Sequence, residues 1–211
     1  MLNSQSKAKI GRYLSYLMQF FIFIFIFVAL YRGQYFIVLA GALALLITFM
    51  PSILSKKWGI TLPWTLNFLI IFALSLHMWG LTYDFYTSYH PFYDKFGHFV
   101  GSIAVALLGF ASVVILTKYT SLKFNKPYVI FFIIIFTLAI GAIWEIGEFA
   151  MDQIFAMRNQ KSLVDTMYDL IFDFIGGLFM AVITNIKFNK MKKGIKFEKN
   201  YNGKKINLSK K

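Results

Sequence analysis

The acidic side chains of this chain are few and gathered in one part of the sequence. Of the nine Asp and Glu residues, eight fall between positions 84 and 173. These eight are Asp84, Asp94, Glu145, Glu148, Asp152, Asp165, Asp169 and Asp173. Carboxylates held close together in apolar surroundings either bind a cation or keep protons, because burial and like charge both disfavour ionisation. This part of the chain is therefore where we expect chemistry.

The spacing of these residues places them on helix faces. Asp94 and His98 are four positions apart, so they share one face of a helix. Two further sets of acids have helical spacing. The first, at i, i+3 and i+7, is Glu145, Glu148 and Asp152. The second, at i, i+4 and i+8, is Asp165, Asp169 and Asp173. Each set forms one stripe, and the second extends about 12 Å at about 1.5 Å per residue. Stripes on adjacent helices can face each other inside a bundle.

The two acidic stripes contain nothing to neutralise them. No Lys or Arg lies between positions 128 and 157 or between 162 and 186, and the chain has no cysteine. Carboxylates with one imidazole and no thiolate suit Mg²⁺, Mn²⁺, Fe²⁺ or Zn²⁺, and no organic cofactor is indicated. We predict metal ligands and catalytic carboxylates, with protonated buried acids as the alternative. The predicted ligands are Asp94, His98, Glu148 and Asp169, and the predicted catalytic residues are Glu145 and Asp173.

Ordinary structural roles can also account for several of these residues. Asp94 could cap a helix or pair with the adjacent Lys95 at the membrane interface. His98 could be a core histidine bonded to a main-chain carbonyl, although an acid lies one turn away. Arg158 and Lys161, in the segment between the two acidic stripes, could bind an anionic head group of the substrate or be solvated.

Composition indicates a membrane protein. Hydrophobic residues make up 58% of the 211 positions and charged residues 15%, against roughly 45–50% and about 25% in soluble domains. Six apolar segments approach the ~20 residues that a helix needs to cross a bilayer. They lie at about 14–31, 35–54, 62–83, 96–116, 128–151 and 163–186. An isolated strand in lipid would leave its main-chain groups unpaired. We therefore predict an all-α polytopic protein with one transmembrane domain, residues 1–186.

The distribution of basic residues predicts the orientation. If the N-terminus is inside, 18 of the 22 Lys and Arg residues fall on cytoplasmic segments, so both termini are expected in the cytoplasm. This accounts for the +13 net charge without a nucleic-acid partner. Residues 187–211 form a basic cytoplasmic tail with ten Lys, which could bind anionic lipid head groups or act only as a solvated stop-transfer segment. We expect a multi-pass protein of the plasma membrane.

Three motifs carry a resemblance to a known family. They are Asp94-Lys95-x-x-His98-Phe99, Trp144-Glu145-Ile146-Gly147-Glu148, and Asp165-x-x-x-Asp169-x-x-x-Asp173 followed by Gly176-Gly177. Over about residues 62–186 the chain resembles the YjdF-type family of small membrane proteins and, more distantly, the VanZ-like membrane proteins. The resemblance implies a multi-pass membrane protein with these motif positions, and it implies no reaction. VanZ-like proteins are linked to glycopeptide-antibiotic resistance and the cell envelope.

Three classes of function fit these observations. The first is a divalent-metal-dependent enzyme acting on a lipid or lipid-linked phosphate at the outer leaflet, with a metal-bound water as nucleophile. The second is a proton- or cation-coupled transporter in which the buried acids relay charge. The third is a non-catalytic cell-envelope factor whose acids are structural. The sequence leaves the substrate and the oligomeric state open.

Overall fold

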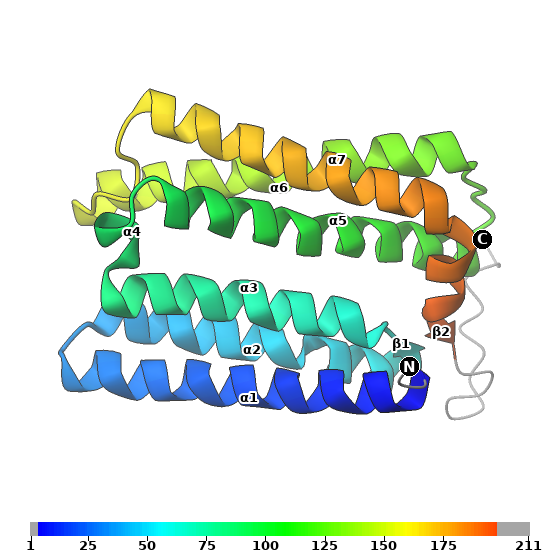
Figure 1. Cartoon of the computed structure of the whole chain (residues 1–211), viewed down its shortest axis with the longest axis horizontal. Helices are drawn as coiled ribbons and strands as arrows, with labels where there is room; N and C mark the ends of the chain where they lie inside the picture. The colour runs from blue at the N-terminus through cyan, green and yellow to red at the C-terminus, as the bar shows by residue number, and fades with distance from the viewer. Residues whose placement is uncertain (1–3, 198–211) are drawn as a thin grey trace.

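The computed structural model describes residues 4–197 and consists almost entirely of helices (Figure 1). In chain order the elements are α1 (Ser4–Tyr31), α2 (Tyr35–Trp58), β1 (Ile60–Thr61), α3 (Trp64–Tyr83), α4 (Phe85–Ser88), α5 (Phe92–Tyr119), α6 (Lys126–Phe155), α7 (Leu163–Gly194) and β2 (Lys196–Phe197). The six long helices are each long and apolar enough to cross a bilayer. The predicted all-α, six-helix membrane architecture is confirmed.

The six long helices form two layers of three (Figure 1). Helices α1, α2 and α3 pack on one another, as do α5, α6 and α7, and the contact between α3 and α5 joins the layers. The start of α1 and the end of α7 lie at the same end of the bundle, which we call the terminal end. The opposite end carries residues 84–91 and 156–162, and we call it the acidic end.

The helix ends follow local sequence signals. The Asn125 side chain accepts a hydrogen bond from the Tyr128 main-chain N–H at the start of α6, and the Ser162 hydroxyl accepts one from Asp165 at the start of α7. Such caps satisfy main-chain groups that have no partner within the helix. Helix α7 continues past residue 186, with a break from helical geometry at Lys187, so residues 187–194 of the predicted tail are helical. The part of that tail from residue 198 onward lies outside the described residues.

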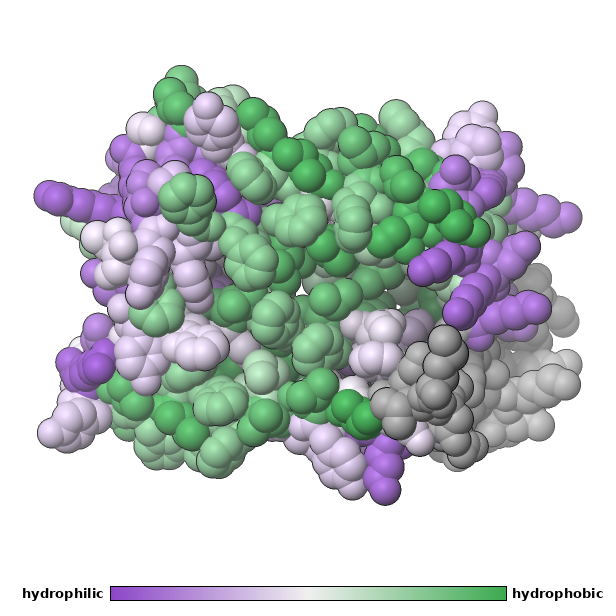
Figure 2. All heavy atoms as spheres, in the orientation of Figure 1, coloured by the Kyte–Doolittle hydropathy of each residue, from purple (hydrophilic) through white to green (hydrophobic). Residues whose placement is uncertain are grey.

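The surface carries an apolar belt between two polar ends (Figure 2). Large hydrophobic side chains on the outer faces of the helices are exposed, among them Phe20, Leu46 and Ile143. Exposed apolar area of this extent matches a bilayer rather than water. The faces turned inward are the ones that carry the buried polar residues.

A short strand pair closes the terminal end. Strands β1 and β2 pair antiparallel, with Ile60 opposite Phe197. Ile60 and Leu62 are buried in one apolar cluster with Ile195, next to the end of α7. The strand pair therefore ties the α2–α3 connection to the chain that follows α7.

Candidate functional site

The acidic residues of α5, α6 and α7 converge near the acidic end of the bundle. Glycines let these helices approach closely. A Cβ at Gly176 would lie 2.8 Å from the Ser102 Cβ and 2.9 Å from the Phe99 carbonyl oxygen, and a Cβ at Gly141 would overlap the Asp173 carboxylate. The α7 stripe of acids therefore lies directly against α5 and α6.

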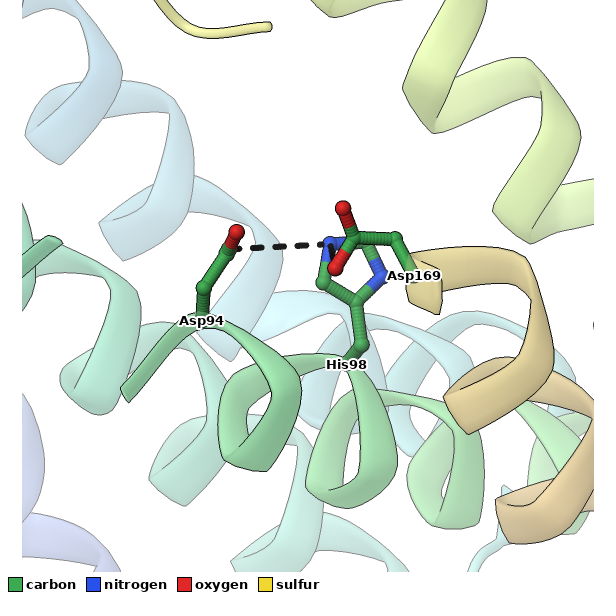
Figure 3. A group of neighbouring side chains, drawn as sticks. All are labelled: Asp94, His98 and Asp169. Carbon is green, nitrogen blue, oxygen red and sulfur yellow. Dashed lines mark ion pairs between the residues drawn. The ribbon is translucent and has the colours of Figure 1, made fainter. Parts of the chain in front are cut away.

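His98 is at the centre of this cluster. Its Nδ1 lies 3.2 Å from Asp173 Oδ1, and its Nε2 lies 3.5 Å from Asp169 Oδ1, 3.6 Å from Glu145 Oε1 and 3.9 Å from Asp94 Oδ1. Figure 3 shows Asp94 and His98 on α5 and Asp169 on α7 turned toward one another. One imidazole thus contacts four carboxylates from three helices.

The contacts of Asp173 determine which nitrogen of the His98 imidazole holds a proton. Asp173 Oδ1 accepts a hydrogen bond from the Ser102 hydroxyl and lies within hydrogen-bond distance of His98 Nδ1. A carboxylate at Nδ1 keeps the proton on that nitrogen and directs Nε2 at whatever lies opposite. Here Nε2 faces three carboxylate oxygens. A lone pair in that position would be repelled, so Nε2 carries a proton or binds a cation.

Lys95 supplies a positive charge that the sequence did not reveal. Its Nζ lies 2.5 Å from Asp165 Oδ1, 2.7 Å from Asp169 Oδ1 and 3.4 Å from Asp94 Oδ2, and the side chain is buried. The sequence offered a pair between Lys95 and Asp94 as an alternative to Asp94 as a metal ligand, and it predicted no contact of Lys95 with Asp165 or Asp169. The available signal was helical spacing, because Lys95, His98 and Ser102 fall at i, i+3 and i+7 on one face of α5.

The donor set could hold a divalent ion. One candidate ligand atom each from Asp94, His98 and Asp169 lies within 4.8 Å of the other two. Both carboxylate oxygens of Glu145 are buried without a hydrogen-bond partner among the described residues, and one of them faces His98 Nε2. Buried charged groups without a partner are costly. A cation among these four residues would satisfy them.

A cavity of about 230 Å³ adjoins the cluster. Its largely apolar walls come mainly from α3, α5 and α6, with single residues from α2, α4 and α7. Asp94, His98, Glu148 and Asp173 line its polar part. The volume exceeds the roughly 150 Å³ of an apolar protein cavity that accepts benzene. The cluster therefore borders a space large enough for part of an organic ligand.

His77 and Tyr86 line the cavity and contact each other. His77 Nδ1 lies 2.7 Å from the Tyr86 hydroxyl oxygen, and the His77 ring meets the Trp144 ring edge to face at 5.1 Å. Burial, together with the negative charge of Asp94, raises the pKa of Tyr86 well above its ordinary value. The phenol is thus neutral at physiological pH. Neither residue was among the predicted site residues, and His77 has no acid one turn away along its helix.

Comparison with known proteins places the chain in a family. A family model described as "Predicted membrane protein (DUF2238)" matches residues 13–190. The chain belongs to this family. A relative from Thermotoga maritima described as "Uncharacterized protein" is 33% identical over 137 residues, which are 64% of this chain and 69% of the relative. No solved structure matches the chain.

The DUF2238 match spans the whole carboxylate cluster and supports the prediction of an uncharacterised integral membrane family. Of the predicted site residues, the structure brings together Asp94, His98, Glu145, Asp169 and Asp173. Glu148 lies on the cavity wall instead, where its Oε1 accepts a 3.0 Å hydrogen bond from the Trp144 indole.

The predicted substrate residues lie in the α6–α7 connection. Lys161 is exposed, and its Nζ donates a 2.8 Å hydrogen bond to the Tyr86 carbonyl oxygen; Arg158 is also exposed. Asp152 holds this connection by accepting hydrogen bonds from the Asn159 and Gln160 main-chain N–H groups at 2.8 and 2.9 Å. Lys161 therefore contacts α4, which contributes Tyr86 to the cavity wall, and does not contact the carboxylate cluster directly among the described residues.

Proposed function

We propose that this member of the DUF2238 family is a divalent-metal-dependent enzyme that acts on a lipid or lipid-linked phosphate at the outer leaflet. The main support for the proposal is that three carboxylate oxygens surround His98 Nε2 at 3.5–3.9 Å. They belong to Asp94, Glu145 and Asp169. Histidine ligands of metals commonly donate their other N–H to a carboxylate, and Asp173 is placed to accept it.

The spacing of the donor atoms supports a metal centre. Ligand atoms bound at about 2.0–2.2 Å lie roughly 2.8–3.1 Å apart when they are octahedral neighbours and roughly 3.3–3.6 Å apart in tetrahedral geometry. The distances from His98 Nε2 to the Asp169 and Glu145 oxygens, 3.5 and 3.6 Å, match the tetrahedral spacing. The 3.9 Å distance to Asp94 would need a small side-chain rotation. We assign Asp94, His98 and Asp169 as ligands, with Glu145 completing the site. Carboxylates with imidazole suit Mg²⁺, Mn²⁺, Fe²⁺ or Zn²⁺.

The charge balance also supports a cation. Five carboxylates surround one ammonium and one imidazole: Asp94, Glu145, Asp165, Asp169 and Asp173, with Lys95 and His98. With His98 protonated, three negative charges remain in excess inside the bundle. A divalent ion bound to His98 Nε2 takes the place of that proton, so the excess falls to two. A water bound to the ion would be the nucleophile, and Glu148, on the cavity wall, would accept its proton.

The cavity supports a lipid as the substrate. Its apolar walls suit a hydrocarbon chain, and the carboxylates and His98 border its polar part. The basic-residue distribution supports cytoplasmic termini, and with that orientation the acidic end and the site would lie at the outer face of the plasma membrane. The basic residues after α7 would then meet anionic lipid head groups at the inner face, and Arg158 with Lys161 would meet the substrate head group at the outer face.

A transporter is the second candidate, and one observation favours it. Close contacts link Asp165, Lys95, Asp169, His98 and Asp173 in an unbroken series from the start of α7 toward the interior. Such a series of titratable groups could carry protons or a cation across part of the membrane.

Metal analysis of the purified protein tests the proposal. Wild type should carry stoichiometric metal, and chelation should lower its melting temperature, because an ion that binds only the folded state stabilises it by about 2.7 kcal/mol at 100 times its Kd. His98→Gln and Asp169→Asn should lose the metal and the response to chelator, and they should fail to release phosphate from a lipid phosphate in mixed micelles. Asp84→Asn, an exposed acid at the same end, is the matched control. Metal-free wild type that does not respond to Mg²⁺, Mn²⁺, Fe²⁺ or Zn²⁺ would exclude the metal centre and favour the transporter.

A further inference from the structure

The cavity is reachable from the side of the bundle. Helices α3 and α6 each pack on α5, whereas within the described chain α3 and α6 do not pack extensively on each other. Three residues that line the cavity are also exposed on the outer surface that would face the membrane: Leu108 (36% exposed), Ile140 (36%) and Trp144 (47%). A chain from the surrounding bilayer could therefore enter between α3 and α6 without crossing a polar barrier.

The charges on the cavity wall are mainly negative, with His98 as the one lining base that contacts the carboxylates among the described residues. Asp94, Glu148 and Asp173 line it, and none of the described lining residues is Lys or Arg. Lys95 is not among the lining residues, but its Nζ lies 3.4 Å from Asp94 Oδ2, and His98 Nδ1 lies 3.2 Å from Asp173 Oδ1. Glu148 has no ion-pair partner among the described residues, and the second oxygen of Asp173 is free of His98. Carboxylates facing an apolar space are unfavourable unless a positive group pairs with them. The wall therefore favours a cationic group and repels an anionic one.

An unsatisfied oxygen supports the same conclusion independently. Asp173 Oδ2 is buried without a hydrogen-bond partner among the described residues, and the Asp173 side chain is only 4% exposed. Nearby, Glu148 has a 3.0 Å hydrogen bond from the Trp144 indole. The rings of Tyr86, Tyr93 and Trp144 border the same space. Aromatic faces attract cations when both are removed from water.

We propose that the cavity binds a membrane amphipath whose polar end carries a positively charged amine. Its hydrocarbon chain lies between α3 and α6, and its nitrogen lies among Glu148, Asp173 and the aromatic rings. The nitrogen site adjoins the proposed metal centre, because Asp173 contacts His98 and Glu148 is the proposed proton acceptor, but binding of the amine does not need the ion. An amphipath with a phosphate alone is excluded from the metal-free cavity by the three carboxylates.

Trp144 serves as a reporter for the occupant. The protein is placed in nanodiscs of zwitterionic lipid with a chelator, and a brominated-chain alkylamine is added as a quencher of tryptophan fluorescence. The fluorescence of the Trp144→Phe variant comes from the other three tryptophans, and subtracting it from the wild-type fluorescence leaves the Trp144 signal. The matched brominated alcohol and alkyl phosphate, with the same chain, report non-specific partition. Wild type should show stronger Trp144 quenching by the amine than by the alcohol, and least by the phosphate.

Charge removal tests the assignment of the nitrogen site. Glu148→Gln should weaken amine quenching about tenfold in apparent affinity, because one partner of a desolvated ion pair is lost. The alcohol should bind the variant as it binds wild type, which also shows that the variant is folded. Asp84→Asn should leave both unchanged. Equal quenching of wild type by amine and alcohol, or tighter binding of the phosphate in chelator, would overturn the proposal. Neither result would bear on metal content, which is measured separately.

Discussion

Replacing Lys95 by methionine tests the central electrostatic feature of the bundle. Methionine keeps most of the length and apolar stem of lysine but removes the ammonium. The Lys95 side chain is 8% exposed, and those of Asp165 and Asp169 are 9% and 4% exposed. The ammonium contacts both carboxylates at 2.5 and 2.7 Å. Without it, two buried carboxylates lose their nearest positive charge.

The expected loss of stability is large. Removing one partner of a buried ion pair costs about 3–5 kcal/mol, because the remaining charge is left uncompensated. For a chain of this length that corresponds to a fall in melting temperature on the order of 10 °C. A second substitution should recover part of the loss. Lys95→Met combined with Asp169→Asn removes one of the stranded charges, so the two effects should not add.

Thermal unfolding in detergent, followed by tryptophan fluorescence, measures these changes. Lys161→Met is the matched control at the same end of the bundle, because Lys161 is exposed and its hydrogen bond within the described part of the chain is to the Tyr86 carbonyl oxygen. It should shift stability by less than about 1 kcal/mol. If Lys95→Met unfolds at the wild-type temperature, the ammonium is not the counter-charge of the cluster, and the reasoning from its burial is wrong.

Three further outcomes are expected. Gly141→Ala should destabilise by about 1–3 kcal/mol in a thermal melt, because its Cβ would overlap the Asp173 carboxylate, whereas Gly147→Ala, which meets open space, should not. The raised pKa of Tyr86 means that the folded state keeps a proton which the unfolded chain loses above pH about 10, so stability should fall as pH rises from there. Tyr86→Phe should remove that part of the fall in melts at increasing pH. A topology reporter inserted after His90 should be exported, and one fused to the final residue should be cytoplasmic; the reverse pattern would contradict the orientation.

Hydropathy was sufficient to predict the number and type of the long elements. Six apolar segments became six helices, because lipid requires main-chain groups to pair within each segment. The boundaries were less predictable. Helix α5 begins at Phe92, four residues before the predicted start, and α7 continues to Gly194. Hydropathy marks where the apolar residues stop, whereas a helix continues until a cap or a break in geometry ends it.

The site was predictable in part, for a geometric reason. Spacing placed Asp94 with His98 and aligned the α7 acids, and these residues do meet. Spacing alone did not show that Glu145 and Glu148 face different neighbours. Three residues of helix rotate by about 300°, so Glu148 is displaced by about 60° from Glu145 around the axis of α6. That rotation turns Glu145 toward His98 and Glu148 toward the cavity.

The role of Lys95 was hidden for a different reason. A lysine next to an aspartate at the start of a span normally extends to the water, because its long stem lets the charge leave the apolar region. Only the position of α7 shows that Asp165 and Asp169 lie within reach of the ammonium. Which helix neighbours α5 is a property of the packed bundle, and one sequence does not specify it.

The β1–β2 pair has a mechanical consequence for the cavity. At the acidic end the two layers are joined covalently, because α3 continues through α4 into α5. At the terminal end the strand pair joins them again by main-chain hydrogen bonds. The two layers are therefore held to each other at both ends, which limits how far they can separate or slide when a ligand enters the space between them. A ligand would enter a space already shaped for it, and little binding free energy would be spent on reorganising the backbone.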